Sequence, residues 1–66
     1  MKTFTLAQAI SVLEENFKGY KILKKWDTIR ELCIVFLDAN GRKWELFSNG
    51  EDYFQHGEDF VIYQTK

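Results

Sequence analysis

The residue types that most often carry out chemistry in proteins are scarce in this chain of 66 residues. Its one cysteine, Cys33, lies in the middle of an apolar run, and burial of a thiol raises its pKa and suppresses its reactivity. Its one histidine, His56, lies in a loop beside acidic residues, with no nucleophile or second ligand next to it in the sequence. We therefore expect Cys33 to be an inert core thiol and His56 to be a solvated loop residue.

Two acidic pairs, Glu51-Asp52 and Glu58-Asp59, are the other candidates for chemistry. Paired carboxylates serve as metal ligands or as acid and base catalysts, but both pairs follow a glycine in turn-like segments, where solvated acids are common. One cysteine and one histidine also fall short of the four ligands of a structural zinc site. The glycines are too scattered to cradle a phosphate. The sequence therefore predicts a protein that is not an enzyme, with no metal site and no cofactor.

Cations and aromatic side chains are mixed between residues 20 and 30, as they are in proteins that bind single-stranded nucleic acid. The residues of this segment that would contact a strand are Tyr20, Lys21, Lys24, Lys25, Trp26 and Arg30. Dedicated nucleic-acid binders are usually strongly basic, whereas the net charge of this chain is −1. Lysines along a strand also protect a sheet edge from pairing with another chain, so nucleic-acid binding is the alternative prediction.

Large apolar side chains exceed what one helix covers on so small a sheet, and aromatic residues of this kind dominate protein interfaces. The candidate interface residues are Trp26, Val35, Leu37, Phe47, Tyr53 and Phe54. Either residues 49–66 fold over these side chains, or the side chains contact a protein partner or a second copy of the chain. The main prediction is therefore a small protein-binding or regulatory module, which is a homodimer if the partner is a second copy.

The elements that position these residues begin with a helix over residues 5–18. Thr5 is a good N-cap, and Gln8 three residues later completes a capping box. Gly19 stands where a left-handed residue ends a helix. Between these ends, apolar side chains at helical spacing form one stripe, made of Leu6, Ala9, Ile10, Leu13 and Phe17.

The stretch from Ile29 to Ser48 is typical of a β-hairpin. Its first strand is apolar at every position from Leu32 to Leu37, and a strand that is apolar on both faces is normally covered on both. Two registers compete at the turn: a two-residue turn at Asn40-Gly41, or a type I turn followed by Gly41 in a left-handed bulge. We predict the bulged turn, because a one-residue slip would place Glu45 in the apolar face. The pairs that this register predicts are Asp38–Arg42, Phe36–Trp44, Val35–Glu45, Ile34–Leu46 and Cys33–Phe47.

Residues 20–26 predict a further strand, in which Tyr20, Ile22, Lys24 and Trp26 share one side, and residues 60–64 predict a last strand. We therefore expect an α+β fold in one domain over residues 1–66, with the N-terminal helix packed on an antiparallel meander sheet of three or four strands. No apolar run approaches about 20 residues, the length of a membrane span. The first residues lack the pattern of a signal peptide, so we expect a cytoplasmic protein that does not contact a membrane.

Several of these features together resemble a PepSY-type domain, over about residues 5–50. The resemblance is carried by the helical stripe of Leu6, Ala9 and Ile10, the Gly19-Tyr20 exit, the Asp38-Ala39-Asn40-Gly41 turn and Trp44-Glu45-Leu46. It implies a small sheet flanked by helix, and a role in modulating peptidases. PepSY domains usually belong to exported or membrane proteins. The layout is also similar to that of stand-alone phage or plasmid proteins that bind and inhibit a host protein.

Overall fold

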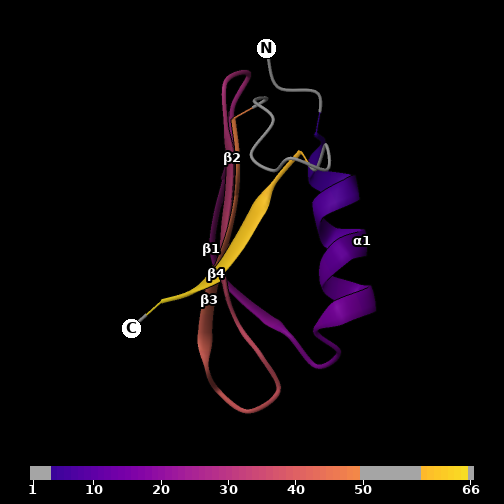
Figure 1. Cartoon of the computed structure of the whole chain (residues 1–66), viewed down its shortest axis with the longest axis vertical. Coiled ribbons are helices and arrows are strands. Elements are labelled where there is room, and N and C mark those ends of the chain that lie inside the picture. The colour runs from indigo at the N-terminus through magenta and orange to yellow at the C-terminus, as the bar shows by residue number, and fades with distance from the viewer. Residues whose placement is uncertain (1–3, 50–58, 66) are drawn as a thin grey trace.

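A computed structural model describes residues 4–49 and 59–65, and in this part of the chain one helix lies over one face of an antiparallel sheet (Figure 1). The elements in chain order are α1 (Leu6–Asn16), β1 (Lys21–Asp27), β2 (Leu32–Leu37), β3 (Lys43–Ser48) and β4 (Val61–Gln64). Each strand pairs with the next one along the chain, which gives the sheet order β1-β2-β3-β4. The predicted α+β meander is confirmed, with four strands.

The helix begins as its capping residues predict. The Thr5 hydroxyl accepts a hydrogen bond from the Gln8 amide (3.1 Å), and the Gln8 side chain accepts one from the Thr5 amide (2.8 Å). Its end differs from the prediction, because α1 stops at Asn16 and Phe17 is the C-cap with φ of −134°. Leaving the helix at this point brings the Phe17 ring against Phe36, with 5.0 Å between ring centroids. The expected end at residue 18 is therefore two residues too late.

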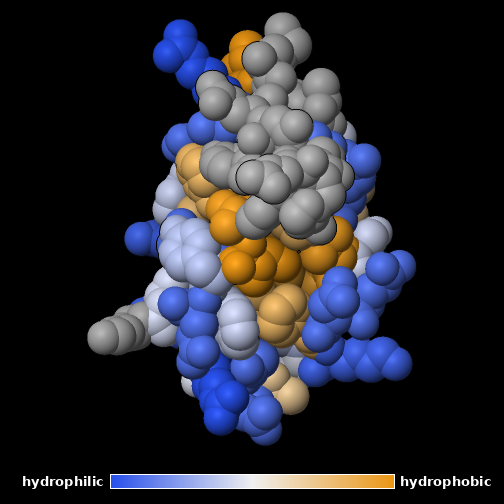
Figure 2. Space-filling view, viewed as in Figure 1, coloured by the Kyte–Doolittle hydropathy of each residue, from blue (hydrophilic) through white to orange (hydrophobic). Residues whose placement is uncertain are grey.

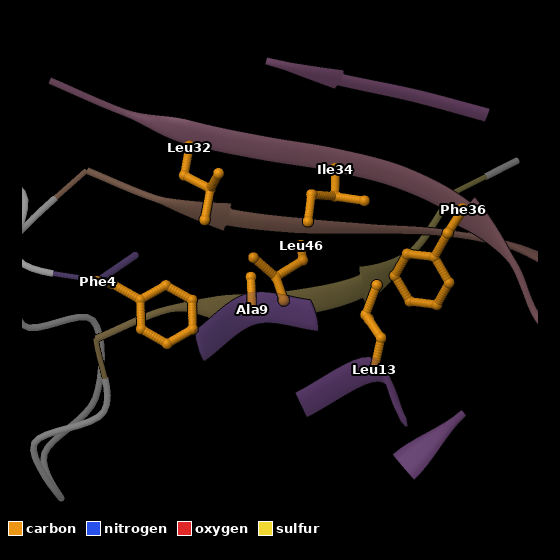
Figure 3. Close-up of a cluster of buried hydrophobic side chains, with 7 residues drawn as sticks. All are labelled: Phe4, Ala9, Leu13, Leu32, Ile34, Phe36 and Leu46. Carbon is orange, nitrogen blue, oxygen red and sulfur yellow. The ribbon is translucent and has the colours of Figure 1, made fainter. Parts of the chain in front are cut away.

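The core lies between α1 and the two central strands. Ala9 and Leu13 point from the helix toward β2 and β3 (Figure 3). The buried cluster consists of Phe4, Ala9, Leu13, Leu32, Ile34, Phe36 and Leu46. Hydrophobic residues reach the surface in this view, with hydrophilic residues on both sides of them (Figure 2). This face of the sheet is therefore covered by the helix that the sequence predicts for it.

The hairpin of β2 and β3 has the predicted bulged turn and register. The Asp38 amide donates to the Arg42 carbonyl (2.9 Å), and Gly41 has φ of +81°, a conformation that glycine adopts without strain. The carboxylate of Asp38 accepts hydrogen bonds from the Trp44 indole N–H (2.9 Å) and from the Asn40 and Arg42 amides (2.8 and 2.9 Å). These bonds, the Trp44 bond first, hold the pKa of Asp38 below its usual value. One carboxylate thus fixes the turn and orients Trp44.

The pattern predicted for the first strand holds for Tyr20 and Ile22, which both pack against the core, and is wrong for Lys24 and Trp26. Ile22 pairs with Phe36 on the helix side of the sheet, but the register shifts by one residue between Ile22 and Lys24. Lys24 therefore pairs with Val35, and Trp26 with Cys33, on the side away from the helix. A β-bulge has this effect, because one extra residue turns every later side chain to the other face.

The last strand extends the sheet. The Ser48 hydroxyl donates to the Asp59 carbonyl at 2.6 Å, which joins the end of β3 to the segment that enters β4. Beyond β4, the Thr65 amide donates to the Lys43 carbonyl at 2.9 Å. Residues 59–65 therefore widen the sheet and do not cross its second face. Tyr53 and Phe54 lie outside the described residues.

Ile34→Val tests whether the helix side of the sheet is a close-packed core. Ile34 is fully buried, so loss of one methyl group should lower the free energy of unfolding by about 0.5–1.5 kcal/mol. The same change in Ile29→Val, at a position that is 74% exposed, should alter it by less than about 0.5 kcal/mol. Denaturant unfolding of both variants measures the difference, and equal effects would contradict this packing.

Candidate functional site

The sheet has a second face, on the side away from α1, and we call it the outer face. Because side chains alternate along a strand, Cys33, Val35 and Leu37 of β2 point away from the helix that packs on Ile34 and Phe36. In Figure 1 the sheet is seen nearly edge-on, with α1 on one side and no described element on the other. The residues of the outer face are Lys21, Lys24, Trp26, Cys33, Val35, Leu37, Lys43, Glu45, Phe47, Val61 and Tyr63.

Cross-strand pairing arranges these residues in three parallel rows. The first row is apolar and consists of Trp26, Cys33, Phe47 and Val61. The second row is mixed and consists of Lys24, Val35, Glu45 and Tyr63. The third row has cations on either side of an apolar residue and consists of Lys21, Leu37 and Lys43. The outer face therefore changes from apolar to cationic along the strand direction.

Two aromatic side chains at opposite edges of this face are exposed. Trp26 of β1 is 40% exposed and Tyr63 of β4 is 43% exposed, whereas Val35, Leu37 and Phe47 between them are half-buried. The Lys24 ammonium lies 5.8 Å from the centroid of the Trp26 ring, within the range of a cation–π contact. The two largest side chains of the outer face therefore reach solvent at its opposite edges.

Glu45 is the hydrogen-bond acceptor at the centre of the outer face. Its Oε2 accepts a bond from the Tyr63 hydroxyl at 2.7 Å and one from the Cys33 thiol at 3.4 Å. Burial, together with the bond to Glu45, raises the pKa of Cys33 to about 12. The bond to Glu45 is the main cause that raises the pKa of Tyr63 to about 12. Cys33, only 1% exposed, is therefore a protonated thiol at neutral pH and a poor nucleophile.

The structure gathers most of the predicted interface residues. Trp26, Val35, Leu37 and Phe47 lie on the outer face together. Val61 and Tyr63 join them there and were missed, although the alternation within the predicted last strand already placed both on one side. Of the predicted interface set, only Tyr53 and Phe54 fall outside the residues described.

The predicted nucleic-acid residues are divided between the two sides of the sheet. Lys21, Lys24 and Trp26 lie on the outer face. Tyr20 packs against the core, and Lys25 pairs with Ile34 on the helix side. Arg30 is exposed in the turn between β1 and β2. Lys43, which the sequence did not single out, brings a third lysine to the outer face.

Sites for catalysis or metal binding were sought in the same part of the chain. Residues 4–49 and 59–65 enclose no pocket and hold no group of three or more His, Cys, Asp and Glu side chains that could bind a metal ion. His56, the Glu51-Asp52 pair and Glu58 lie outside these ranges. In the described part of the chain, no helix has the length and apolar character needed to cross a membrane.

Comparison with known proteins gives no relative for this chain. No family model matches it, and no curated protein or solved structure shows significant similarity to it. The resemblance to PepSY-type domains therefore stays a prediction from the sequence pattern.

Tyr63→Phe tests the hydrogen bond at the centre of the outer face. The pKa of Tyr63 is raised from 10.0 to about 12 in the folded chain, so the bond to Glu45 stabilises the fold below pH 10 and is lost as pH rises toward about 12. Wild type should therefore be more stable than Tyr63→Phe at neutral pH, and the difference should shrink across that alkaline range. Thermal unfolding against pH measures it, and a difference that persists to the end of the range would contradict the bond.

Proposed function

We propose that this protein is a non-enzymatic binding module and that the outer face is where it contacts a protein partner. The observation that carries the proposal is an apolar row that runs across all four strands, on a face that no described element covers. In this row Trp26 is 40% exposed, and Phe47 and Val61 are half-buried. Apolar side chains that a sheet face leaves partly exposed together are common at interaction sites.

The chemistry of the outer face supports contact with a protein. Aromatic residues are enriched where proteins meet, because they bury a large area with few rotatable bonds. Trp26 and Tyr63 are such side chains, and both are partly exposed. Cys33 is buried and protonated, so it fills space beneath the outer face and is a poor nucleophile.

The edge strand β1 supports a partner that binds the outer face and does not pair with the edge of the sheet. β1 is one edge strand and carries Lys21, Lys24 and Lys25 together with a bulge, which are features that prevent pairing with another strand. The apolar row of Trp26, Cys33, Phe47 and Val61 contains no lysine that would discourage contact with another protein. A module of this kind acts by occupying a surface of its partner, and the partner in turn stabilises so short a chain by mass action.

Trp26→Ala tests the proposed contact. A partner captured from the native host, identified and then purified, should bind this variant about tenfold more weakly or worse, since truncation of an anchoring aromatic commonly costs 2 kcal/mol or more. Ile29→Ala is the control for loss of an exposed apolar side chain, because Ile29 is more exposed than Trp26 and lies in the turn between β1 and β2, outside the paired rows. Titration calorimetry gives both affinities. A partner that binds the Trp26 variant as tightly as wild type does not use the outer face.

A second candidate function is binding of single-stranded nucleic acid by the same face. The observation that favours it is the presence of Lys21, Lys24 and Lys43 beside the exposed ring of Trp26. The net charge of −1 and the carboxylate of Glu45 at the centre of the face weigh against it.

Lys24→Ala and Lys25→Ala are a matched pair for this second candidate, because neighbouring lysines of β1 face opposite sides of the sheet. Fluorescence anisotropy with a labelled oligonucleotide should show weaker binding for Lys24→Ala only, and binding of the wild type should fall as salt concentration rises. Equal loss in both variants would show that the outer face is not a specific nucleic-acid site.

A further inference from the structure

The three lysines of the outer face define the chemistry of the partner, if that face binds a protein as proposed above. Lys21 and Lys43 lie in the row farthest from Trp26, and Lys24 lies in the middle row. Among the strand residues of the outer face that the structure describes, the carboxylate is that of Glu45, which already accepts hydrogen bonds from Tyr63 and Cys33. A complementary surface must therefore bring carboxylates to one end of the outer face and apolar side chains to the other.

The spacing of the rows sets a length for that complementary surface. From Cys33 in the apolar row to Leu37 in the cationic row is four residues of strand, or about 13 Å. An α-helix covers this distance in about two and a half turns. The same sheet already packs a helix of 11 residues on its other face, and a second helix would complete a layer on each side of it.

We propose that the outer face binds an acidic amphipathic helix of a partner protein. The apolar side chains of this helix lie on Trp26 and Phe47, and its Asp or Glu residues, about two turns away, lie over Lys21 and Lys43. Lys24 lies between the apolar row and the cationic row, so its long side chain reaches toward either end of the bound helix.

The described residues of a second copy do not meet these requirements. When two outer faces meet about a two-fold axis, the row of Lys21 and Lys43 meets either its own equivalent or the apolar row, and neither supplies a set of carboxylates. The helix α1 of a second copy is also unsuitable, because its apolar stripe is already packed on its own sheet.

The experiment is a selection of displayed helical peptides, randomised along one face, against the full-length chain, with counter-selection against Trp26→Ala. We expect peptides with apolar residues at one end and Asp or Glu about two turns away. Their affinity should fall about tenfold or more in the double variant Lys21→Glu with Lys43→Glu. It should not change in Lys25→Glu, which alters the helix side of the sheet. Circular dichroism shows whether each variant is folded.

The other outcomes separate the two proposals. Peptides that depend on Trp26 but are neutral or basic overturn the acidic helix and leave the protein-binding function standing. Failure to select any Trp26-dependent peptide counts against both. A dimer in sedimentation that Trp26→Ala abolishes identifies a second copy as the occupant and overturns the acidic helix. An oligonucleotide that binds through the same lysines, when no acidic peptide does, overturns it as well.

Discussion

Strand β2 is apolar on both of its faces, and this constraint organises the rest of the structure. Leu32, Ile34 and Phe36 require a cover on one side, and α1 supplies it with Ala9 and Leu13. Cys33 and Val35 require a cover on the other side as well, where residues 4–49 and 59–65 supply no second helix. In the described part of the chain, α1 covers one apolar face of β2 and no element covers the other. The binding function that we propose follows from this difference between the two faces.

The bulge in β1 gives the outer face its shape and its chemical direction. Strict alternation would place Trp26 on the helix side with Ile22, beside the buried Leu32. The extra residue instead puts Trp26 beside Cys33 and Lys24 beside Val35. An edge strand tolerates such a shift because only one neighbour depends on its register. The bulge therefore adds an aromatic anchor and a cation to a face that β2 and β3 alone would leave smaller and less polar.

The sequence predicted the helix start, the strand order and the register of β2 with β3, because local chemistry specifies each of them. Thr5 and Gln8 form a capping box, and Gly41 permits the left-handed bulge that keeps Glu45 off the helix side. The bulge in β1 was not predicted, since neither Leu23 nor its neighbours is a glycine that would mark it. The meeting of Glu45, Tyr63 and Cys33 depends on the position of β4, which pairs with β3 from beyond a segment whose conformation the sequence pattern does not specify.

Hydroxyl-radical footprinting of the isolated monomer is the most direct test of an outer face that its own chain leaves accessible. Mass spectrometry of the labelled peptides compares the exposed Trp26 and Tyr63 with the buried Phe36 and Leu46. Rapid labelling of Trp26 and Tyr63 in the folded monomer, with Phe36 and Leu46 protected, is the result that we expect. Protection of Trp26 and Tyr63 to the level of Phe36 would show that the chain covers both faces of its sheet, and would contradict the account.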